Sequence, residues 1–470
     1  MINFFRGNYP SRLFALLILF FLLRVPLLLF GVPLTTADLH HFLIGERMAD
    51  GFSLYSQIYD PVAPLSAAVF WVIDLLAGRA DDVYLALGSG LLLVQALRIN
   101  TIFNRNKVHP EKSYLPAIVY VLAGSIFFEY DRVSPMLLGV TCLVFALSYF
   151  SSFSEGGDNS NQSFKGGLLL GLAALFYLPM VWYLAVGVFA IMYFASHSFR
   201  NVLLLLVAFL FPFAIAGTYY LYTDALNQFL TYHIAEAALL GRGRLLPVND
   251  LLLLLWPMLL LLLAAFFQLY AESSSLNFRV RFQQLMVLWL LVSVPVIMSG
   301  GVVSVRSYAV LLPAVAYFSM QAFAVRKPVW ISETLFWIIA VGVVWSRYGH
   351  FLASAGLYAI DTSNLVVSEN PYPAIRNKKV LVLGDNQSVF LQNKPATPYL
   401  HWPIAAKDFG NISSYNSIYR IDKNIRADMP DVIVDENGLM PKLHYHLPVL
   451  MNEFKAVDGK KVWIRKETAD

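Results

Sequence analysis

Residues 12–32 read RLFALLILFFLLRVPLLLFGV, an almost unbroken apolar run. Its length matches the roughly 17–25 residues that an α-helix needs to cross a bilayer. Basic Arg6 and Arg12 precede or open the run, as in a signal peptide, but the run contains Arg24 and no small-x-small cleavage site follows it. We therefore interpret it as an uncleaved first transmembrane span.

The rest of the chain repeats this apolar character. Of its 470 residues, 58% are hydrophobic and 14% are charged, and the mean hydropathy is +0.60. Soluble domains have about 45–50% apolar and about 25% charged residues. The sequence therefore predicts a polytopic α-helical membrane protein. Further apolar runs lie near 83–103, 114–129, 133–152, 166–179, 180–197, 201–222, 250–270, 283–299, 307–325 and 328–346.

The stretch Pro61–Gly78 is ambiguous, because it is apolar but contains Asp74 and begins with two prolines. It could span the bilayer or lie on its surface as an interfacial helix. The positive-inside rule favours the second interpretation, because the cluster Arg105, Lys107 and Lys112 would otherwise lie outside. We therefore predict about eleven spans in a bacterial inner membrane. The N-terminus would be cytoplasmic, the first outer loop would cover 33–82, and the C-terminus would be periplasmic.

The chain becomes mixed and polar after its last apolar run. We predict a transmembrane domain over 1–346 and a small soluble α/β domain over 361–470. Lys379–Gly384 is typical of a buried strand that ends at a glycine turn, and Asp431–Asp435 of a second strand. Leu447–Phe454 suits a helix. Asp458-Gly459 is typical of a hairpin turn.

The first outer loop holds the densest set of ionisable residues beside the membrane. A carboxylate there can act as a general base if it reaches an acceptor hydroxyl. In the alternative reading, these side chains solvate the polar face of a surface helix over Ala37–Asp50, and Asp38 is a helix N-cap. A divalent cation on Asp38, His40 and His41 is a third possibility, although adjacent histidines on a helix point about 100° apart. The set is Asp38, His40, His41, Glu46, Arg47, Asp50 and Asp60.

Cationic side chains at the outer face are candidates for a lipid phosphate. Arg242, Arg244 and Arg306 have the planar guanidinium that matches phosphate oxygens. Each could instead bind ordinary lipid headgroups. Arg24, inside the first span, needs a partner, and Asp74 is a candidate.

Several other classes of site are disfavoured. A net charge of +4 does not suggest nucleic acid as a partner, and the single cysteine, Cys142, rules out intramolecular disulfides and cysteine-based metal patterns. The turn Gly384-Asp385-Asn386 lacks the glycine spacing of nucleotide-binding loops.

Four stretches together resemble the GT-C glycosyltransferases, which include the protein O-mannosyltransferases and the lipid A aminoarabinose transferase. The first is Thr36-Ala-Asp38-Leu-His-His, continued by Leu54-Tyr55 and by Tyr59-Asp60-Pro61-Val-Ala-Pro64-Leu65. The others are Glu129-Tyr-Asp131-Arg-Val-Ser-Pro, Arg306-Ser-Tyr308 with Pro313, and Val380-Leu-Val-Leu-Gly384-Asp385 with Pro430-Asp-Val-Ile-Val434.

This resemblance implies transfer of a sugar from a polyprenyl-phosphate carrier to a lipid, glycan or protein acceptor at the outer face. Asp38 would be the catalytic base or acceptor-orienting group. Arg306 would face the lipid phosphate, and Tyr308 lies in the same motif. We add Arg242, Arg244, Asp60 and His41 as candidate substrate-binding residues. A divalent metal remains open, and no other cofactor is implied.

Two departures from the family pattern leave other functions open. Leu39 occupies the position after Asp38 where the family usually has a second acidic residue. The lysine that precedes Pro-Pro in the aminoarabinose enzymes is also absent, and Val62-Ala63 stand in that region. The alternatives are a non-catalytic membrane scaffold for cell-envelope assembly and a transporter or flippase. Apart from Arg24, few ionisable groups fall near the middle of the apolar runs, which counts against a transporter.

Overall fold

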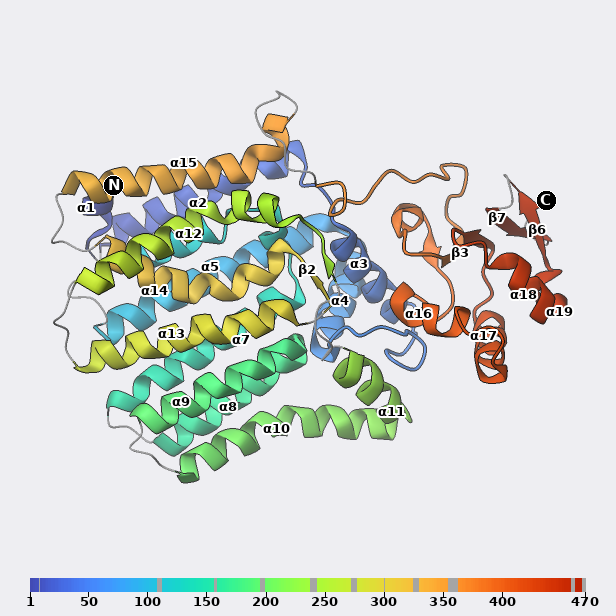
Figure 1. The fold of residues 1–470 in the computed structure, drawn as a ribbon, viewed down its shortest axis with the longest axis horizontal. Helices are drawn as coiled ribbons and strands as arrows, with labels where there is room; N and C mark the ends of the chain where they lie inside the picture. The colour runs from blue at the N-terminus through green and yellow to red at the C-terminus, as the bar shows by residue number, and fades with distance from the viewer. Residues whose placement is uncertain are drawn as a thin grey trace. The chain divides into compact units, whose positions relative to one another are not determined.

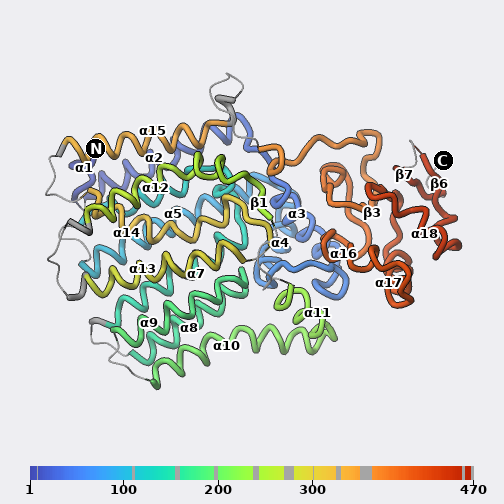
Figure 2. Tube along the Cα trace, in the orientation of Figure 1, coloured from blue at the N-terminus to red at the C-terminus, as the bar shows by residue number. Residues whose placement is uncertain are grey.

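The chain forms two compact units in a computed structural model, and Figure 2 traces the described residues in colour. Unit 1 comprises Met1–Pro33, Asp81–Tyr219 and Ala237–Asn364, and unit 2 comprises Leu34–Ala80, Tyr220–Glu236 and Leu365–Asp470. The structure describes residues 1–7, 9–107, 112–155, 159–194, 199–236, 243–271, 277–299, 301–323, 329–353, 362–457 and 461–466.

Unit 1 is mostly helical, and its long helices pack side by side with roughly parallel axes (Figure 1). Among the residues that the structure describes, five helices contain a stretch long and apolar enough to cross a membrane, which indicates a multi-pass membrane protein: α2 (Pro10–Phe30), α5 (Asp81–Arg105), α10 (Phe199–Tyr222), α12 (Val248–Ala271) and α13 (Asn277–Met298). The other helices are α1 (Ile2–Phe5), α6 (Leu115–Ala123), α7 (Pro135–Ser151), α8 (Asn159–Phe176), α9 (Leu184–Phe194), α14 (Leu312–Ala322) and α15 (Val329–Ala353).

Each of the eleven predicted runs overlaps a helical segment among the described residues, but some of those helices are short. Helix α6 has nine residues, and all nine are buried. At 1.5 Å per residue it is about 14 Å long, well below the roughly 30 Å of a hydrocarbon core. An apolar run therefore marks burial inside the protein as readily as contact with lipid. The number of eleven spans stays a prediction.

Short 3-10 and strand segments connect some of these helices. The 3-10 turns are η1 (Phe128–Tyr130), η2 (Ser152–Glu155), η3 (Leu178–Tyr183) and η5 (Val305–Leu311). Strands β1 (Gly243–Arg244) and β2 (Val302–Val303) pair in parallel, so the chain near Arg244 lies beside the chain that leads into η5.

Unit 2 contains a five-stranded mixed sheet in the order β4-β3-β5-β7-β6. The predicted strands are present as β3 (Lys379–Leu383) and β5 (Val432–Asp435), which pair in parallel. Strand β4 (Lys394–Pro395) is parallel to β3. The predicted hairpin strands β6 (Phe454–Val457) and β7 (Val462–Arg465) pair antiparallel, whereas Asp458 and Gly459 lie outside the described residues.

Four helices of the tail accompany this sheet: α16 (Trp402–Phe409), α17 (Tyr415–Ala427), α18 (Met440–His446) and α19 (Pro448–Met451). Buried Leu381, Ile433 and Ile425 join strands and helix in one apolar core. The helix predicted over Leu447–Phe454 is wrong in extent, because α19 stops at Met451 and Phe454 begins β6.

Unit 2 also contains residues 34–80 of the predicted first outer loop, which form α3 (Thr36–Ala49) and α4 (Pro64–Ala77). Thr36 N–H donates to the Leu365 carbonyl at 3.0 Å, and Val367 N–H donates to the Leu34 carbonyl at 2.9 Å. Segment Tyr220–Glu236 adds α11 (Leu226–Phe229) and a π-helical turn, η4 (Leu230–Glu236). The tail therefore shares one compact unit with two segments that precede it by more than a hundred residues.

The two helices of this loop pack closely. Gly45 of α3 permits the approach, because a Cβ atom there would lie 2.6 Å from the Phe70 carbonyl oxygen of α4. The surface-helix interpretation of Ala37–Asp50 is wrong in one respect. Asp38, His41 and Arg47 do not solvate a polar face, because all three side chains are buried.

Candidate functional site

Asp38 lies in the first turn of α3, and its carboxylate is 1% exposed. Thr35, rather than Asp38, is the N-cap of the helix: Asp38 N–H donates to Thr35 Oγ1 at 3.1 Å. The Thr35 hydroxyl donates in turn to Asp38 Oδ2 at 2.7 Å. The Thr35 hydroxyl therefore caps the first turn and holds the Asp38 carboxylate at the same time. It fixes the orientation of the carboxylate at the start of the helix.

Two residues further along α3, His40 forms a partly buried ion pair with Asp60 of the following loop. His40 Nε2 lies 2.6 Å from Asp60 Oδ2, and Val62 N–H donates to Asp60 Oδ1 at 2.8 Å. Burial alone would raise the pKa of Asp60, but the His40 charge and these hydrogen bonds outweigh it and lower that pKa. Burial alone would lower the pKa of His40, but Asp60 and Gln387 outweigh it and raise that pKa.

The tail completes the surroundings of His40. The Gln387 amide lies 2.9 Å from His40 Nδ1, and the His401 ring stands edge-on at 5.9 Å between centroids. When the imidazole carries a proton on both nitrogens, Gln387 must accept from Nδ1–H through its amide oxygen. The arrangement therefore links the start of α3 to the loop after β3.

The three candidate metal ligands of this loop take different partners. Asp38 contacts Thr35, His40 contacts Asp60, and the His41 ring stacks on Phe70 at 4.5 Å between centroids. No group of three or more acidic, histidine or cysteine side chains suited to a metal occurs in the part of the chain that the structure describes. The described residues thus offer no ready-made metal site.

The opposite end of α3 is held by ion pairs to the tail. Arg47 Nη1 lies 2.7 Å from Asp428 Oδ2 and donates to the Pro395 carbonyl at 3.2 Å. Arg79, which follows α4, pairs with Glu46. Asp38 therefore sits on a helix that the tail fixes at several points along its length.

The remaining candidates belong to unit 1. Arg306 is buried in η5, and its backbone N–H donates to Glu129 Oε2 at 3.2 Å. The neighbouring Tyr130 hydroxyl donates to the Val305 carbonyl at 3.0 Å. Tyr308 is half-buried in the same turn. The structure thus joins the acidic stretch at 129–131 to the Arg306 motif, two stretches that the family resemblance singles out separately.

Of the last two arginine candidates, Arg244 and Arg242, the structure describes only Arg244. Arg244 is exposed in strand β1 and pairs with Val303, which precedes the first residue of η5 by two residues. Arg242 lies outside the described residues. Asp38, His41 and Asp60 belong to unit 2, whereas Arg244, Arg306 and Tyr308 belong to unit 1.

Arg24 has a different partner from the one predicted. The prediction of Asp74 as the partner of Arg24 is wrong, because Arg24 Nη2 lies 3.3 Å from Asp131 Oδ1. Arg347 of α15 pairs with the same carboxylate at 2.6 Å and donates to the Leu23 carbonyl at 2.6 Å. All three charged side chains are buried. Two guanidinium groups on one carboxylate tie α2 and α15 to the residues beside Glu129.

Sequence reasoning missed Arg347 and the role of Asp131. Arg347 is the first cation after the apolar run 328–346, and a basic residue at that place is ordinary for the end of a span. An arginine buried inside a bundle needs a counter-charge, which is the signal that could have prompted a search for its partner. Nothing in the chain pattern says that the partner is Asp131.

The glycine turn after β3 is acidic. A Cβ atom at Gly384 would meet the side chain of Glu436, which would then have to move. Asn386 N–H donates to Glu436 Oε2 at 3.3 Å. Burial raises the pKa of Glu436, and the nearby Asp385 charge acts in the same direction. Carboxylates at this turn would repel phosphate, in agreement with its missing nucleotide-binding pattern.

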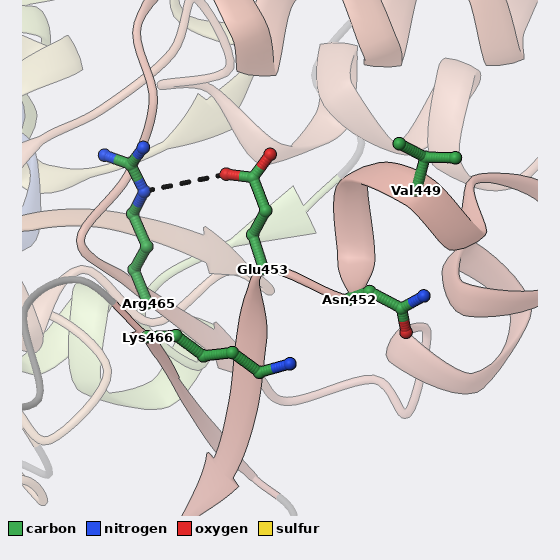
Figure 3. Close-up of a pocket in the computed structure, with 5 residues that line it drawn as sticks. All are labelled: Val449, Asn452, Glu453, Arg465 and Lys466. Atoms are coloured by element: carbon green, nitrogen blue, oxygen red, sulfur yellow. Dashed lines mark ion pairs between the residues drawn. The ribbon is translucent and has the colours of Figure 1, made fainter.

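A pocket in the tail lies apart from all of these residues. Val449, Asn452, Glu453, Arg465 and Lys466 line it (Figure 3). Arg465 Nε lies 3.7 Å from Glu453 Oε2 across it. None of its five residues is a predicted site residue.

Comparison with known proteins gives a likeness of fold. No protein-family model matches the chain, and no curated protein matches it. The oligosaccharyltransferase of Archaeoglobus fulgidus in its apo form is similar with a TM-score of 0.48 at 11% identity, over 93% of this chain and 71% of that one. The same enzyme in complex with Zn and sulfate has a TM-score of 0.44 at 13% identity, over 94% and 71%.

A likeness at these TM-scores and identities concerns the course of the chain only. It assigns no activity, substrate or residue role to this protein.

Proposed function

We propose that this protein is a membrane glycosyltransferase that moves a sugar from a polyprenyl-phosphate carrier to an acceptor at the outer face of a bacterial inner membrane. The observation that carries the proposal is the buried carboxylate of Asp38. It stands in the first turn of α3, eight residues after Phe30, the last residue of helix α2, which is long and apolar enough to cross a membrane. A long lipid-linked donor presents its phosphate at that level of the membrane.

Asp38 would act as the base or acceptor-orienting group. A carboxylate held by the Thr35 hydroxyl and by the helix start cannot rotate freely, which suits a group that must meet an acceptor hydroxyl in one orientation. The nearby His40–Asp60 pair and its link to Gln387 support the position of α3. The acceptor can be a lipid, a glycan or a protein.

Arg306 would face the departing lipid phosphate. A cationic group stabilises the negative charge that develops on the leaving phosphate. Glu129 at the Arg306 backbone holds that turn in place. Arg244 and Tyr308, together with Arg242, Asp60 and His41, are proposed as further substrate contacts, and residues 361–470 as a soluble cover or acceptor-binding domain.

One observation favours a second candidate, a non-catalytic membrane scaffold of the same fold. The hydrogen bond from the Thr35 hydroxyl, at a helix N-terminus that favours negative charge, already explains why an acidic residue occupies this position. A protein that had lost the transfer reaction could keep Asp38 for the stability of α3 alone. The substitution of Leu39 for the usual second acid agrees with this view.

The substitution Asp38→Asn separates the two functions. Asparagine keeps the size of the side chain and can still accept from the Thr35 hydroxyl, so the chain should remain folded and inserted. Loss of a general base lowers a rate by about 10²–10⁴-fold. The measurement is sugar transfer by the purified protein in nanodiscs, with the donor first identified as a lipid-linked sugar bound to the protein in mass spectra.

The matched control is Asp50→Asn, because Asp50 is a partly exposed carboxylate at the other end of the same helix. It should leave the transfer rate unchanged. Full activity in Asp38→Asn would remove Asp38 from the mechanism. A wild-type protein that binds and transfers none of the lipid-linked sugars offered to it would favour the scaffold.

A further inference from the structure

Helix α4 has one face packed in protein and one face bare. Ser66, Ala67, Phe70 and Ile73 are buried. On the other side, Trp71 is 38% exposed, Val72 44%, Leu75 63% and Leu76 81%. A soluble protein rarely leaves four neighbouring large apolar side chains in water without a partner.

The bare face is apolar over its whole extent. At 100° per residue, the residues that share it are Leu65, Ala68, Val69, Trp71, Val72, Leu75 and Leu76, and none is polar. The one ionisable residue of the helix, Asp74, lies on the packed side, where its Cβ is near Gly45 of α3. One face of the helix thus contacts protein and the other is entirely apolar, as expected of a helix that lies between protein and hydrocarbon.

A helix of the same unit shows the contrast. Helix α17 also has one buried face, with Ile421 and Ile425 at its centre. Its exposed side carries Arg420, Lys423 and Arg426. Water therefore faces α17, and the bare side of α4 requires a different neighbour.

The length of α4 and its place in the chain identify that neighbour. Fourteen residues give a helix of about 21 Å, too short to cross a hydrocarbon core of about 30 Å. Only Gly78, Arg79 and Ala80 separate its last residue from Asp81, the first residue of α5, a helix long and apolar enough to span the membrane. The chain therefore keeps the end of α4 that carries Leu75 and Leu76 within reach of lipid.

We propose that α4 lies in the interfacial layer of the bilayer with Trp71, Val72, Leu75 and Leu76 turned toward the acyl chains. Interfacial helices bury their apolar face by about 5–10 Å, and tryptophan suits the headgroup level. The helix thereby anchors unit 2, including the tail, to the membrane through a contact of its own. This inference does not depend on sugar transfer.

The test places a nitroxide label on the bare face of the full-length chain in nanodiscs of phosphatidylethanolamine and phosphatidylglycerol. Cys142→Ser removes the single cysteine of the chain, and Leu76→Cys or Val72→Cys then carries the label. Lys423→Cys on α17 is the control. Power saturation compares collisions of each label with apolar oxygen and with a water-soluble nickel chelate.

Labels at positions 76 and 72 should collide several-fold more with oxygen than with nickel, whereas the label at position 423 should show the reverse. Equal nickel access at positions 76 and 423 would overturn the proposal. Dipolar broadening at position 76 that disappears on dilution with unlabelled chain would also overturn it, because the face would then cover a second copy. The experiment has no catalytic readout, so a failed test of sugar transfer does not affect it.

Discussion

Replacing Arg47 by methionine should destabilise unit 2 selectively. The guanidinium is 3% exposed and meets Asp428 at 2.7 Å. It donates to the carbonyls of Pro395 and Thr397 and lies over the Phe52 ring at 3.6 Å. Methionine fills similar space and keeps the contact with Phe52 but leaves the Asp428 carboxylate without its buried counter-charge.

Removing one partner of a buried pair typically costs about 3–5 kcal/mol. Asp428 keeps a hydrogen bond from Thr397 N–H at 3.0 Å and an ion pair with Lys379 at 2.9 Å. We therefore expect the lower end of the range, about 3 kcal/mol. That free energy corresponds to about a hundredfold change in the equilibrium for local opening.

Hydrogen exchange followed by mass spectrometry measures this opening in the full chain in nanodiscs. Peptides of β3 and β5 should exchange about a hundredfold faster in Arg47→Met, whereas peptides of α13 in unit 1 should not change. Arg426→Met is the matched control, because Arg426 pairs with Asp422 at 2.9 Å on the surface. An exposed i,i+4 pair contributes about 0.3–0.5 kcal/mol, so its effect should stay near twofold.

A second substitution tests the reason for the effect. In Arg47→Met/Asp428→Asn no charge of the pair remains buried, so the double variant should be less destabilised than the sum of the two single variants. Exchange of β3 and β5 at the wild-type rate in Arg47→Met would refute the reasoning. So would equal acceleration in α13, because the loss would then not be confined to unit 2.

Two further predictions concern α3. The pKa of His40 is raised, so its charge stabilises the fold fully below its unfolded pKa of about 6.5, and this stability is lost as the pH rises through the folded pKa. Hydrogen exchange of α3 in the wild type should therefore become faster above the folded pKa. His40→Gln should make the exchange of α3 less dependent on pH in this range. In acid, the lowered pKa of Asp60 has the corresponding effect: its charge stabilises the fold above its unfolded pKa of about 3.8, and this stability is lost as the pH falls through the folded pKa. Gly45→Ala places a Cβ 2.6 Å from the Phe70 carbonyl oxygen and should cost about 1–3 kcal/mol in exchange of α3 and α4. Gly90→Ala, where nothing lies within 4 Å, should be neutral or stabilising by up to about 1 kcal/mol; equal effects of the two alanines would contradict the close approach of α3 to α4.

The local pattern of apolar and polar residues predicted helices and strands well where their surroundings are those that the pattern normally indicates. The apolar run at 12–32 became α2, and Lys379–Gly384 became β3 with one residue fewer. The pattern failed where the surroundings differ from the expected ones. Leu115–Ala123 reads like part of a span but is a short helix buried on every side, because protein and lipid select the same apolar residues.

The candidate site shows the same division between residue type and partner. The acidic and basic residues near Asp38 were identifiable as a dense set of ionisable groups, and Asp60 was among them. Their partners were not: His40 meets Gln387 after an interval of 347 residues, and Arg47 meets Asp428 after 381. Sequence spacing carries no information about contacts at such separations, since they depend on how the whole unit closes.

The amino-acid sequence by itself determined that this is a membrane protein with a mixed α/β tail, because apolar length and strand patterning are local properties of the chain. Only the tertiary structure decided that residues 34–80 and 220–236 form one unit with that tail. It also decided that Asp131, and not Asp74, neutralises Arg24. Buried charges select their partners by proximity in the folded chain, and that proximity arises only when the helices pack.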